Sequence, residues 1–174
     1  VKPDTTLAKA AGIEIGAKGG IAVNLFNQSS NPDIYAIGDA AEKSDELTGE
    51  STLIPLANIA NRHGRITSDH IAGKSVREVA SIGTAIVKVF DLAVATTGWN
   101  AKRLAAAGKP FTEIHTHPNS HATYYPGATQ FSLKLIFDPK SGEILGAQGV
   151  GRDGVDKRID VIATALRAGV TAPA

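Results

Sequence analysis

One hairpin decides the fold of this chain, and it occupies residues 131–150. Two apolar runs, Phe131-Ser132-Leu133-Lys134-Leu135-Ile136-Phe137 and Ile144-Leu145-Gly146-Ala147-Gln148-Gly149-Val150, flank the segment Asp138-Pro139-Lys140-Ser141-Gly142. The composition of the two apolar runs is typical of β-strands. The segment between them predicts a turn, because proline presets φ and glycine accepts a positive φ. We therefore expect an antiparallel pair of strands here.

Further strands and helices are predicted around this hairpin. Apolar patterns indicate strands over residues 85–90 and 111–116, and Asn100 is a good N-cap for a helix ending at Gly108. A last helix is expected from about 154 to 168, opened by Asp153 or Asp156 and ended by Gly169. Antiparallel strands with helices on one face predict an α+β domain.

The first 78 residues have a different pattern. We expect a short helix over residues 4–11 with Leu7 and Ala11 on one face, then a hairpin of residues 13–15 and 21–23. A polar loop follows over 40–52, and a helix from Ile54 or Pro55 to about residue 71 carries Pro55 in its first turn. The pattern breaks near residues 72–75, so we predict two domains, 1–78 and 79–174.

Composition excludes several classes of protein. A chain of 174 residues with 43% hydrophobic residues can bury one sizeable core or two small ones. Its net charge of +1 predicts neither a nucleic-acid nor a membrane partner. Cysteine is absent, so this chain itself supplies no thiolate nucleophile, disulfide or thiolate metal ligand.

The run Ile34-Tyr35-Ala36-Ile37-Gly38-Asp39 places a carboxylate and a glycine together at the end of an apolar segment. We interpret Ile34, Ala36 and the apolar residues beside them as a short buried strand. Gly38 allows a ligand to approach the backbone, and Asp39 can accept hydrogen bonds from two hydroxyl groups. A turn or a helix N-cap is the alternative role for Asp39.

Several motifs together carry a family resemblance. They are Val1-Lys2-Pro3-Asp4-Thr5, Asp33-Ile34-Tyr35-Ala36-Ile37-Gly38-Asp39-Ala40, Pro55-Leu56-Ala57, Lys88-Val89-Phe90-Asp91, His121-Ala122-Thr123-Tyr124-Tyr125-Pro126-Gly127-Ala128 and Gly154-Val155-Asp156-Lys157-Arg158-Ile159-Asp160-Val161. The chain resembles the C-terminal part of a flavin-dependent pyridine nucleotide-disulfide oxidoreductase. The resemblance is nearest to the coenzyme A-disulfide reductase and NADH-dependent persulfide reductase branch. It implies an excised, cytoplasmic fragment that lacks the catalytic cysteine and the NAD(P)H domain and is inactive alone.

The resemblance also implies the roles of particular residues. Gly38 and Asp39 would hold the ribityl chain of FAD, while Pro55, Leu56 and Ala57 would face its isoalloxazine ring. Coenzyme A would pass Asn61 and Arg62. These roles make residues 1–78 the C-terminal part of an α/β FAD-binding domain and residues 79–174 a dimerisation domain.

Tyr124 is the candidate catalytic residue of the resemblance. A homodimer would form through residues 80–174, and Tyr124 would reach into the active site of the partner subunit, where a phenol can donate to a developing thiolate. Packing at the dimer interface is the alternative role of Tyr124 and Tyr125. A related NADH oxidase or peroxidase, and a purely structural dimerisation module, are the alternative functions.

Two further patterns suggest ligand sites. The segment Gly149-Val150-Gly151-Arg152-Asp153-Gly154 matches a dinucleotide fingerprint, but no strand with an acidic residue follows it, so we interpret it as a tight turn from strand to helix. His115, His117 and His121 could bind a metal if they converged. We interpret them as polar residues at a strand end and predict no metal site.

Overall fold

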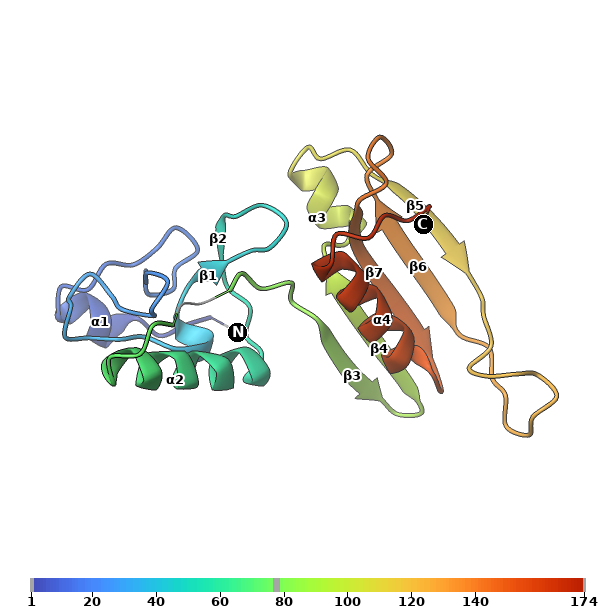
Figure 1. The fold of residues 1–174 in the computed structure, drawn as a ribbon, viewed down its shortest axis with the longest axis horizontal. Helices are drawn as coiled ribbons and strands as arrows, with labels where there is room; N and C mark the ends of the chain where they lie inside the picture. The colour runs from blue at the N-terminus through green and yellow to red at the C-terminus, as the bar shows by residue number, and fades with distance from the viewer. Residues whose placement is uncertain (1, 77–78, 174) are drawn as a thin grey trace. The chain divides into compact units, whose positions relative to one another are not determined.

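The computed structural model describes residues 2–76 and 79–173. The chain divides into two compact units, Val1–Ser81 and Ile82–Ala174, which Figure 1 shows with their helices and strands labelled. The expected boundary between residues 78 and 79 adjoins residues 77–78, which lie outside the described residues.

The first unit contains little regular structure. Its elements are α1 (Thr6–Ala10), the 3-10 turn η1 (Gly38–Ala40), β1 (Lys43–Ser44), β2 (Ser51–Thr52) and α2 (Ala57–Ile71). Strands β1 and β2 form an antiparallel pair. The predicted hairpin around residue 18 is reduced to one antiparallel bridge between Ile15 and Ile21.

Two local expectations for this unit were wrong. Residues 34–37 form no strand, because their pairing is limited to a single bridge between Gln28 and Tyr35, and Ile34 is exposed rather than buried. The short helix expected over residues 4–11 is present as α1, which buries none of its residues. Pro55 precedes α2 instead of opening it, since the N-cap is Leu56 in an extended conformation.

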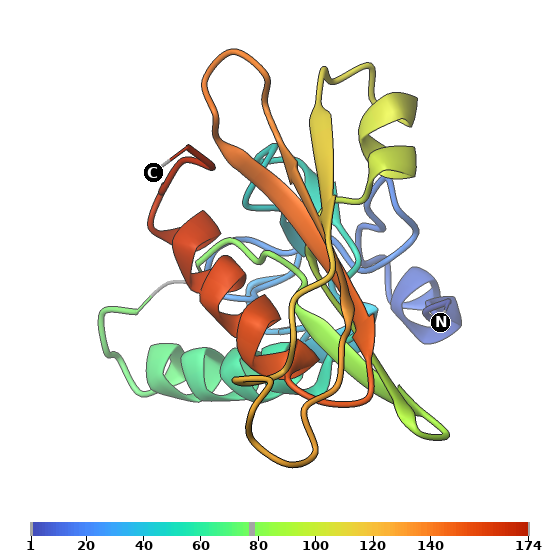
Figure 2. The same ribbon diagram turned by 90° about the vertical axis from the view of Figure 1, so that its right-hand side faces the viewer.

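The second unit is a five-stranded antiparallel sheet with a helix packed on one face. Its elements are β3 (Ala85–Val89), β4 (Leu92–Gly98), α3 (Ala101–Ala106), β5 (Thr112–Thr116), β6 (Ser132–Phe137), β7 (Ile144–Gly151) and α4 (Val155–Arg167). The strand order is β3-β4-β7-β6-β5. Figure 2 shows α4 lying along the sheet. The α+β prediction is confirmed, although β4, one of the inner strands, was not predicted.

The core of this unit lies between the sheet and α4. Five buried residues form it, namely Ala95, Phe131, Ala147, Val155 and Ile159, with Ala93, Leu133, Leu135 and Ile162 packed around them. Small residues on β4 and β7 let the helix approach closely, and burial of this apolar surface is the main force that holds helix and sheet together.

The turn from β7 into α4 explains the glycine-rich segment. A Cβ on Gly149 would lie 2.8 Å from Cγ1 of Val155, and a Cβ on Gly151 would overlap the side chain of Phe131. Gly154 is the N-cap and has a φ of 75°, so neither Asp153 nor Asp156 occupies the cap position as expected. The side chain of Asp153 instead accepts a hydrogen bond from the N–H of Gly154. These glycines therefore serve packing and a tight turn, as interpreted.

Two other local predictions are confirmed. Oδ1 of Asn100 accepts a hydrogen bond from the N–H of Arg103 at 2.8 Å, which caps α3. Oδ1 of Asp138 accepts from the N–H groups of Lys140 and Ser141, both at 2.8 Å, and Gly142 has a φ of 75°.

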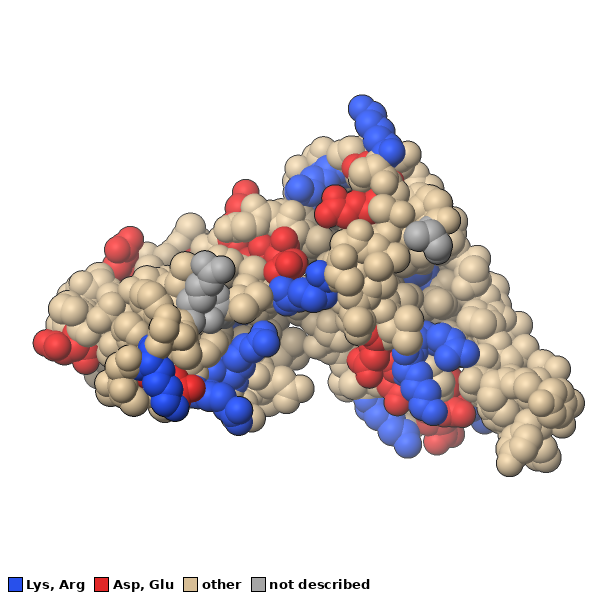
Figure 3. Space-filling view, viewed as in Figure 1, with Lys and Arg blue, Asp and Glu red and all other residues tan. Residues whose placement is uncertain are grey.

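Basic and acidic side chains are interspersed on the face shown in Figure 3. None of the helices in the described ranges combines the length and apolar character needed to span a membrane.

Candidate functional site

The candidate site of the first unit is built on the turn η1. Gly38 has a φ of 69°, a conformation that favours glycine. It lies against α2, since an added Cβ would be 3.2 Å from the Cβ of Ala60. Asp39 follows it, and its side chain is exposed. The Asp39 carboxylate is therefore exposed to solvent, while the backbone of the turn packs tightly against α2.

Two buried polar side chains, those of His63 and Lys43, form hydrogen bonds with the backbone of this turn. The N–H of Gly38 donates to Nδ1 of His63 at 3.3 Å, and the fully buried His63 comes from the second turn of α2. The carbonyl oxygen of Gly38 accepts from Nζ of Lys43 at 3.1 Å. Lys43 is only 3% exposed and also donates to the carbonyl oxygen of Ala41 at 2.9 Å.

Sequence reasoning missed both of these residues. The spacing of Ile59, His63 and Ile66 follows one helix face, which could have marked His63 as inward-facing. No comparable signal marks Lys43, because it lies in a two-residue strand after an irregular segment.

The start of α2 is the second part of the candidate site. Its N-cap residue, Leu56, makes no side-chain capping hydrogen bond, and its carbonyl oxygen accepts from the N–H groups of Ile59 and Ala60. Pro55 and Ala57 are exposed beside it. Because the first N–H groups of a helix have no partner within it, this end attracts a negatively charged or electron-rich group.

The structure places the two substrate candidates on the same helix. Asn61 and Arg62 are consecutive exposed residues of α2, directly before the buried His63. The turn η1 packs on this helix. Seven of the eight candidate residues are thus on η1, at the start of α2 or along it.

The eighth candidate, Tyr124, belongs to the second unit. It lies in the loop between β5 and β6, whose base is closed by a bridge between Asn119 and Gln130. Tyr124 is 89% exposed and Tyr125 is 64% exposed. The ring of Tyr125 meets that of His121 edge-on at 5.6 Å, whereas Tyr124 makes no contact with another ring among the described residues. A phenol displayed in this way can act on a group outside its own unit.

The three histidines of this region do not form a metal site. His115 lies near Glu113, His117 pairs with Ser132, and His121 pairs with Ser120. Within residues 2–76 and 79–173, no group of three or more His, Cys, Asp or Glu side chains is placed to hold a metal ion.

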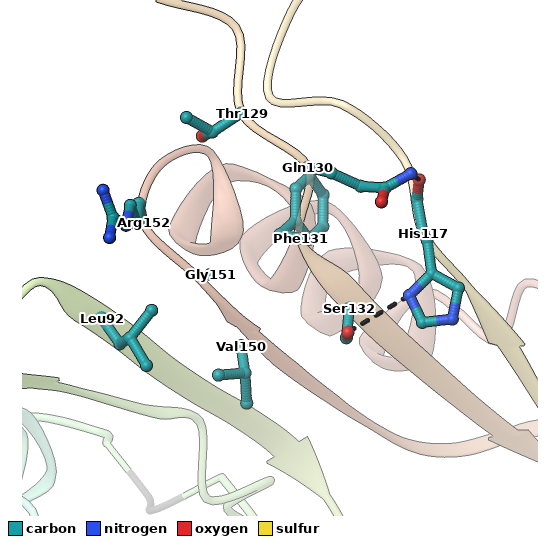
Figure 4. Close-up of a pocket in the computed structure, with 9 residues that line it drawn as sticks. All are labelled: Leu92, His117, Thr129, Gln130, Phe131, Ser132, Val150, Gly151 and Arg152. Atoms are coloured by element: carbon teal, nitrogen blue, oxygen red, sulfur yellow. Dashed lines mark hydrogen bonds between the residues drawn. The ribbon is translucent and has the colours of Figure 1, made fainter.

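An open pocket of about 450 Å³ lies on the second unit, at the ends of β4, β6 and β7 (Figure 4). Arg152 and His117 stand on opposite sides of it, with Phe131 between them. Nδ1 of His117 is 3.2 Å from Oγ of Ser132. The pocket contains none of the residues predicted for the site.

Comparison with known proteins decides the family. The family model for the dimerisation domain of pyridine nucleotide-disulphide oxidoreductases matches residues 84–174, and a second model of the same family matches residues 1–64. The chain belongs to the pyridine nucleotide-disulphide oxidoreductase family. The resemblance drawn from its motifs is confirmed.

Individual relatives cover nearly all of the chain. It is 35% identical over 171 residues to an NAD(P)H sulfur oxidoreductase (CoA-dependent) of Pyrococcus furiosus, which accounts for 98% of this chain and 38% of that protein. It is 37% identical over 166 residues to an NADH oxidase of Methanocaldococcus jannaschii, covering 95% of this chain and 37% of the relative. The structure of reduced CoADR-RHD from Bacillus anthracis matches with a TM-score of 0.94 and 52% identity, over 98% of this chain and 31% of that one. The chain thus spans about a third of the length of these family members.

Members of this oxidoreductase family depend on FAD and NAD(P)H. The described residues fit part of a flavin site. The exposed Asp39 suits a polyol, and the N–H groups at the start of α2 suit an electron-rich ring. No residue of this chain supplies the redox-active cysteine, because it contains none.

Proposed function

We propose that this chain acts as part of a flavin-dependent NAD(P)H oxidoreductase that reduces a coenzyme A disulfide or persulfide. Residues 1–78 would form the C-terminal part of its FAD-binding domain, and residues 79–174 its dimerisation domain. The observation that carries the proposal is the exposed carboxylate of Asp39 on a turn that packs against α2, the helix whose start has no side-chain cap. The names of relatives, which include coenzyme A disulfide reductases and a coenzyme A polysulfide/persulfide reductase, supply the substrate class.

Each residue of the site has a distinct task in this proposal. Asp39 accepts hydrogen bonds from ribityl hydroxyl groups, and Gly38 leaves room for the chain to approach. Pro55, Leu56 and Ala57 form the start of α2, where backbone N–H groups stabilise negative charge. FAD, when bound, passes electrons from NAD(P)H to a cysteine-bound sulfur, and that cysteine comes from a part of the enzyme outside these 174 residues.

Asn61 and Arg62 would guide the substrate. Both are exposed on α2 one turn beyond its start, so they can meet a ligand that approaches the flavin along this helix. Coenzyme A carries several phosphate groups, which a guanidinium binds through charge-assisted hydrogen bonds. Arg62 is therefore proposed as a phosphate contact and Asn61 as a hydrogen-bond partner of the same ligand.

Tyr124 would act in the active site of the partner subunit. Its exposed phenol can donate its proton toward the sulfur that leaves as a thiolate, which lowers the barrier to departure. A homodimer would then be required for catalysis, because neither subunit holds a complete set of groups.

The experiment uses the proposed full-length reductase and measures NADH consumption with coenzyme A disulfide, coenzyme A persulfide or oxygen as the acceptor. Turnover with one of the sulfur acceptors is expected, and Tyr124→Phe is expected to lower it by about 10²-fold. Tyr125→Phe is the matched control on the neighbouring phenol. Equal losses in both variants would show that the rings only pack at the interface.

An NADH oxidase is the second candidate function. The relative from Methanocaldococcus jannaschii, an NADH oxidase, favours it. Turnover with oxygen alone that does not change in Tyr124→Phe would establish this alternative and remove Tyr124 from the chemistry.

A further inference from the structure

We propose that His63 and Lys43 together are positioning residues for flavin binding. They form hydrogen bonds with the N–H and the carbonyl oxygen of Gly38, and this clamp fixes the direction of the Asp39 carboxylate. This inference rests on the proposed function, since it concerns how the ribityl contact is held. Neither residue belongs to the flavin site inferred from the family motifs.

The two hydrogen bonds hold different peptide units. The N–H of Gly38 belongs to the peptide unit that joins it to Ile37, and this group donates to Nδ1 of His63 at 3.3 Å. The carbonyl oxygen of Gly38 belongs to the peptide unit that joins it to Asp39, and it accepts from Nζ of Lys43 at 3.1 Å. Because φ and ψ of Gly38 are rotations between these two units, fixing both units fixes the two angles.

The conformation that is fixed in this way needs support. Gly38 has a φ of 69°, and glycine populates positive and negative φ about equally when nothing else restrains it. A free glycine next to Asp39 would let the carboxylate sample several directions. Loss of that freedom on ligand binding would weaken the affinity for FAD, so a turn that is already rigid binds more tightly.

Both clamping residues are themselves held in place. His63 is fully buried on α2, a helix of 15 residues, and its carbonyl oxygen accepts from Nδ2 of Asn27. Lys43 is 3% exposed and bonds to a second carbonyl oxygen, that of Ala41. A buried lysine is costly unless its ammonium group is hydrogen-bonded, so its position depends on these carbonyl groups.

The hydrogen bond from Gly38 requires an acceptor atom on the side chain of residue 63. Nδ1 of His63 can accept from the N–H of Gly38 only when it carries no proton. Substitutions of His63 can therefore be chosen according to whether they keep a hydrogen-bond acceptor at the place of Nδ1. Asparagine places a carbonyl oxygen near the place of Nδ1 and keeps an acceptor, whereas leucine keeps apolar volume and removes it.

The experiment measures the dissociation constant of FAD for the proposed full-length reductase after removal and readdition of the flavin. His63→Leu and Lys43→Met are each expected to weaken FAD binding by about 10-fold, the effect of one lost hydrogen bond that positions a ligand group. His63→Asn is expected to restore binding to within about 3-fold of the wild type. Lys9→Met, at an exposed lysine of α1, is the control and should change nothing.

A double-mutant cycle with Asp39→Asn separates positioning from general stability. If the clamp acts through the carboxylate, His63→Leu adds little once Asp39→Asn has removed its target, so the combined loss is smaller than the product of the single losses. If the loss of FAD affinity in the double variant equals the product of the two single losses, His63 supports the fold without positioning Asp39, and the inference is overturned.

The remaining outcomes distinguish this inference from the proposed function. A wild-type protein that binds no FAD would overturn both. FAD binding that is weakened by Asp39→Asn but unchanged by His63→Leu and Lys43→Met would leave the function standing and remove the clamp. Thermal unfolding of the flavin-free variants identifies any that do not fold, and His63→Asn and Lys43→Met then carry the test.

Discussion

Gly146 on β7 lies so close to Trp99 that a Cβ at this position would overlap the carbonyl oxygen of Trp99. The N–H of Trp99 meanwhile donates to the carbonyl oxygen of Leu145 at 2.9 Å. The chain therefore passes from β4 into α3 directly over the backbone of β7. A side chain at residue 146 would separate these two segments.

Gly146→Ala is accordingly expected to destabilise the second unit by about 3 kcal/mol, because the methyl group has no space and the backbone must move. Urea unfolding of the 174-residue chain, followed by the fluorescence of its single tryptophan, measures the change. Gly108→Asn is the control, since Gly108 has a φ of 64° and open space around it. Asparagine tolerates that conformation, so a change within about 1 kcal/mol is expected. Equal losses at both positions would contradict the overlap.

The Asn100 cap can be tested by exchanging only its acceptor oxygen. Asn100→Ala removes the hydrogen bond from the N–H of Arg103 and is expected to cost about 1 kcal/mol of unfolding free energy. Asn100→Asp keeps an acceptor at the same place and should remain near the wild-type value. Urea unfolding of the three proteins provides the comparison, and a loss in the aspartate variant as large as in the alanine variant would argue against the cap.

The turn at Asp138 predicts a dependence of stability on pH. Hydrogen bonds from the N–H groups of Ser141 and Lys140 lower the pKa of the Asp138 carboxyl below its ordinary value of 3.8. A carboxyl group with a lowered pKa in the folded state stabilises it above the ordinary pKa, and this contribution is lost as the pH falls below 3.8 toward the folded value.

An NMR titration of the Asp138 side chain is expected to give a midpoint below 3.8. Asp138→Asn should make the unfolding free energy less dependent on pH in the acidic range. A midpoint at or above the ordinary value would show that the turn does not hold the ionised form.

Self-association should involve the face of the sheet that α4 leaves uncovered. Ala95 and Ala147 face α4, so Val94 and Val150 point to the other side, and Val87 is paired with Val94. Val87 is 57% exposed and Val150 is 39% exposed. Apolar side chains in such a row favour contact with a second copy of a dimerisation domain.

We therefore expect Val87→Lys and Val150→Lys to shift the chain from dimer to monomer in sedimentation velocity experiments. Val161→Lys is the control, because Val161 is an equally apolar residue on α4 with 66% exposure. Dissociation by the control substitution alone would place the interface on the helix face instead.

The 174-residue chain by itself is expected to bind FAD weakly and to show no NADH turnover. It contains the turn and the start of α2 but no cysteine, and it spans about a third of its relatives. Quenching of flavin fluorescence on titration with the protein measures the affinity. Tight binding at one FAD per chain would show that these residues hold most of the flavin site.

Local chemistry explains which parts of the fold could be predicted. The Asp138 turn and the Asn100 cap depend on side chains and backbone within a few residues, so both are readable from the sequence. Strand β4 was missed because its alanine residues and terminal glycine give little strand signal, and its pairing with β3 and β7 is what makes it a strand.

The motifs of the sequence by themselves determined the family and led to the proposal of Gly38 and Asp39 as site residues. Only the tertiary structure decided how that site is held. His63 is 25 positions from Gly38 along the chain, and the hydrogen bond between them exists because α2 packs beneath the turn. Helix packing depends on contacts between distant residues, which no local pattern encodes, so the hydrogen bond that holds Gly38 became visible only in the folded chain.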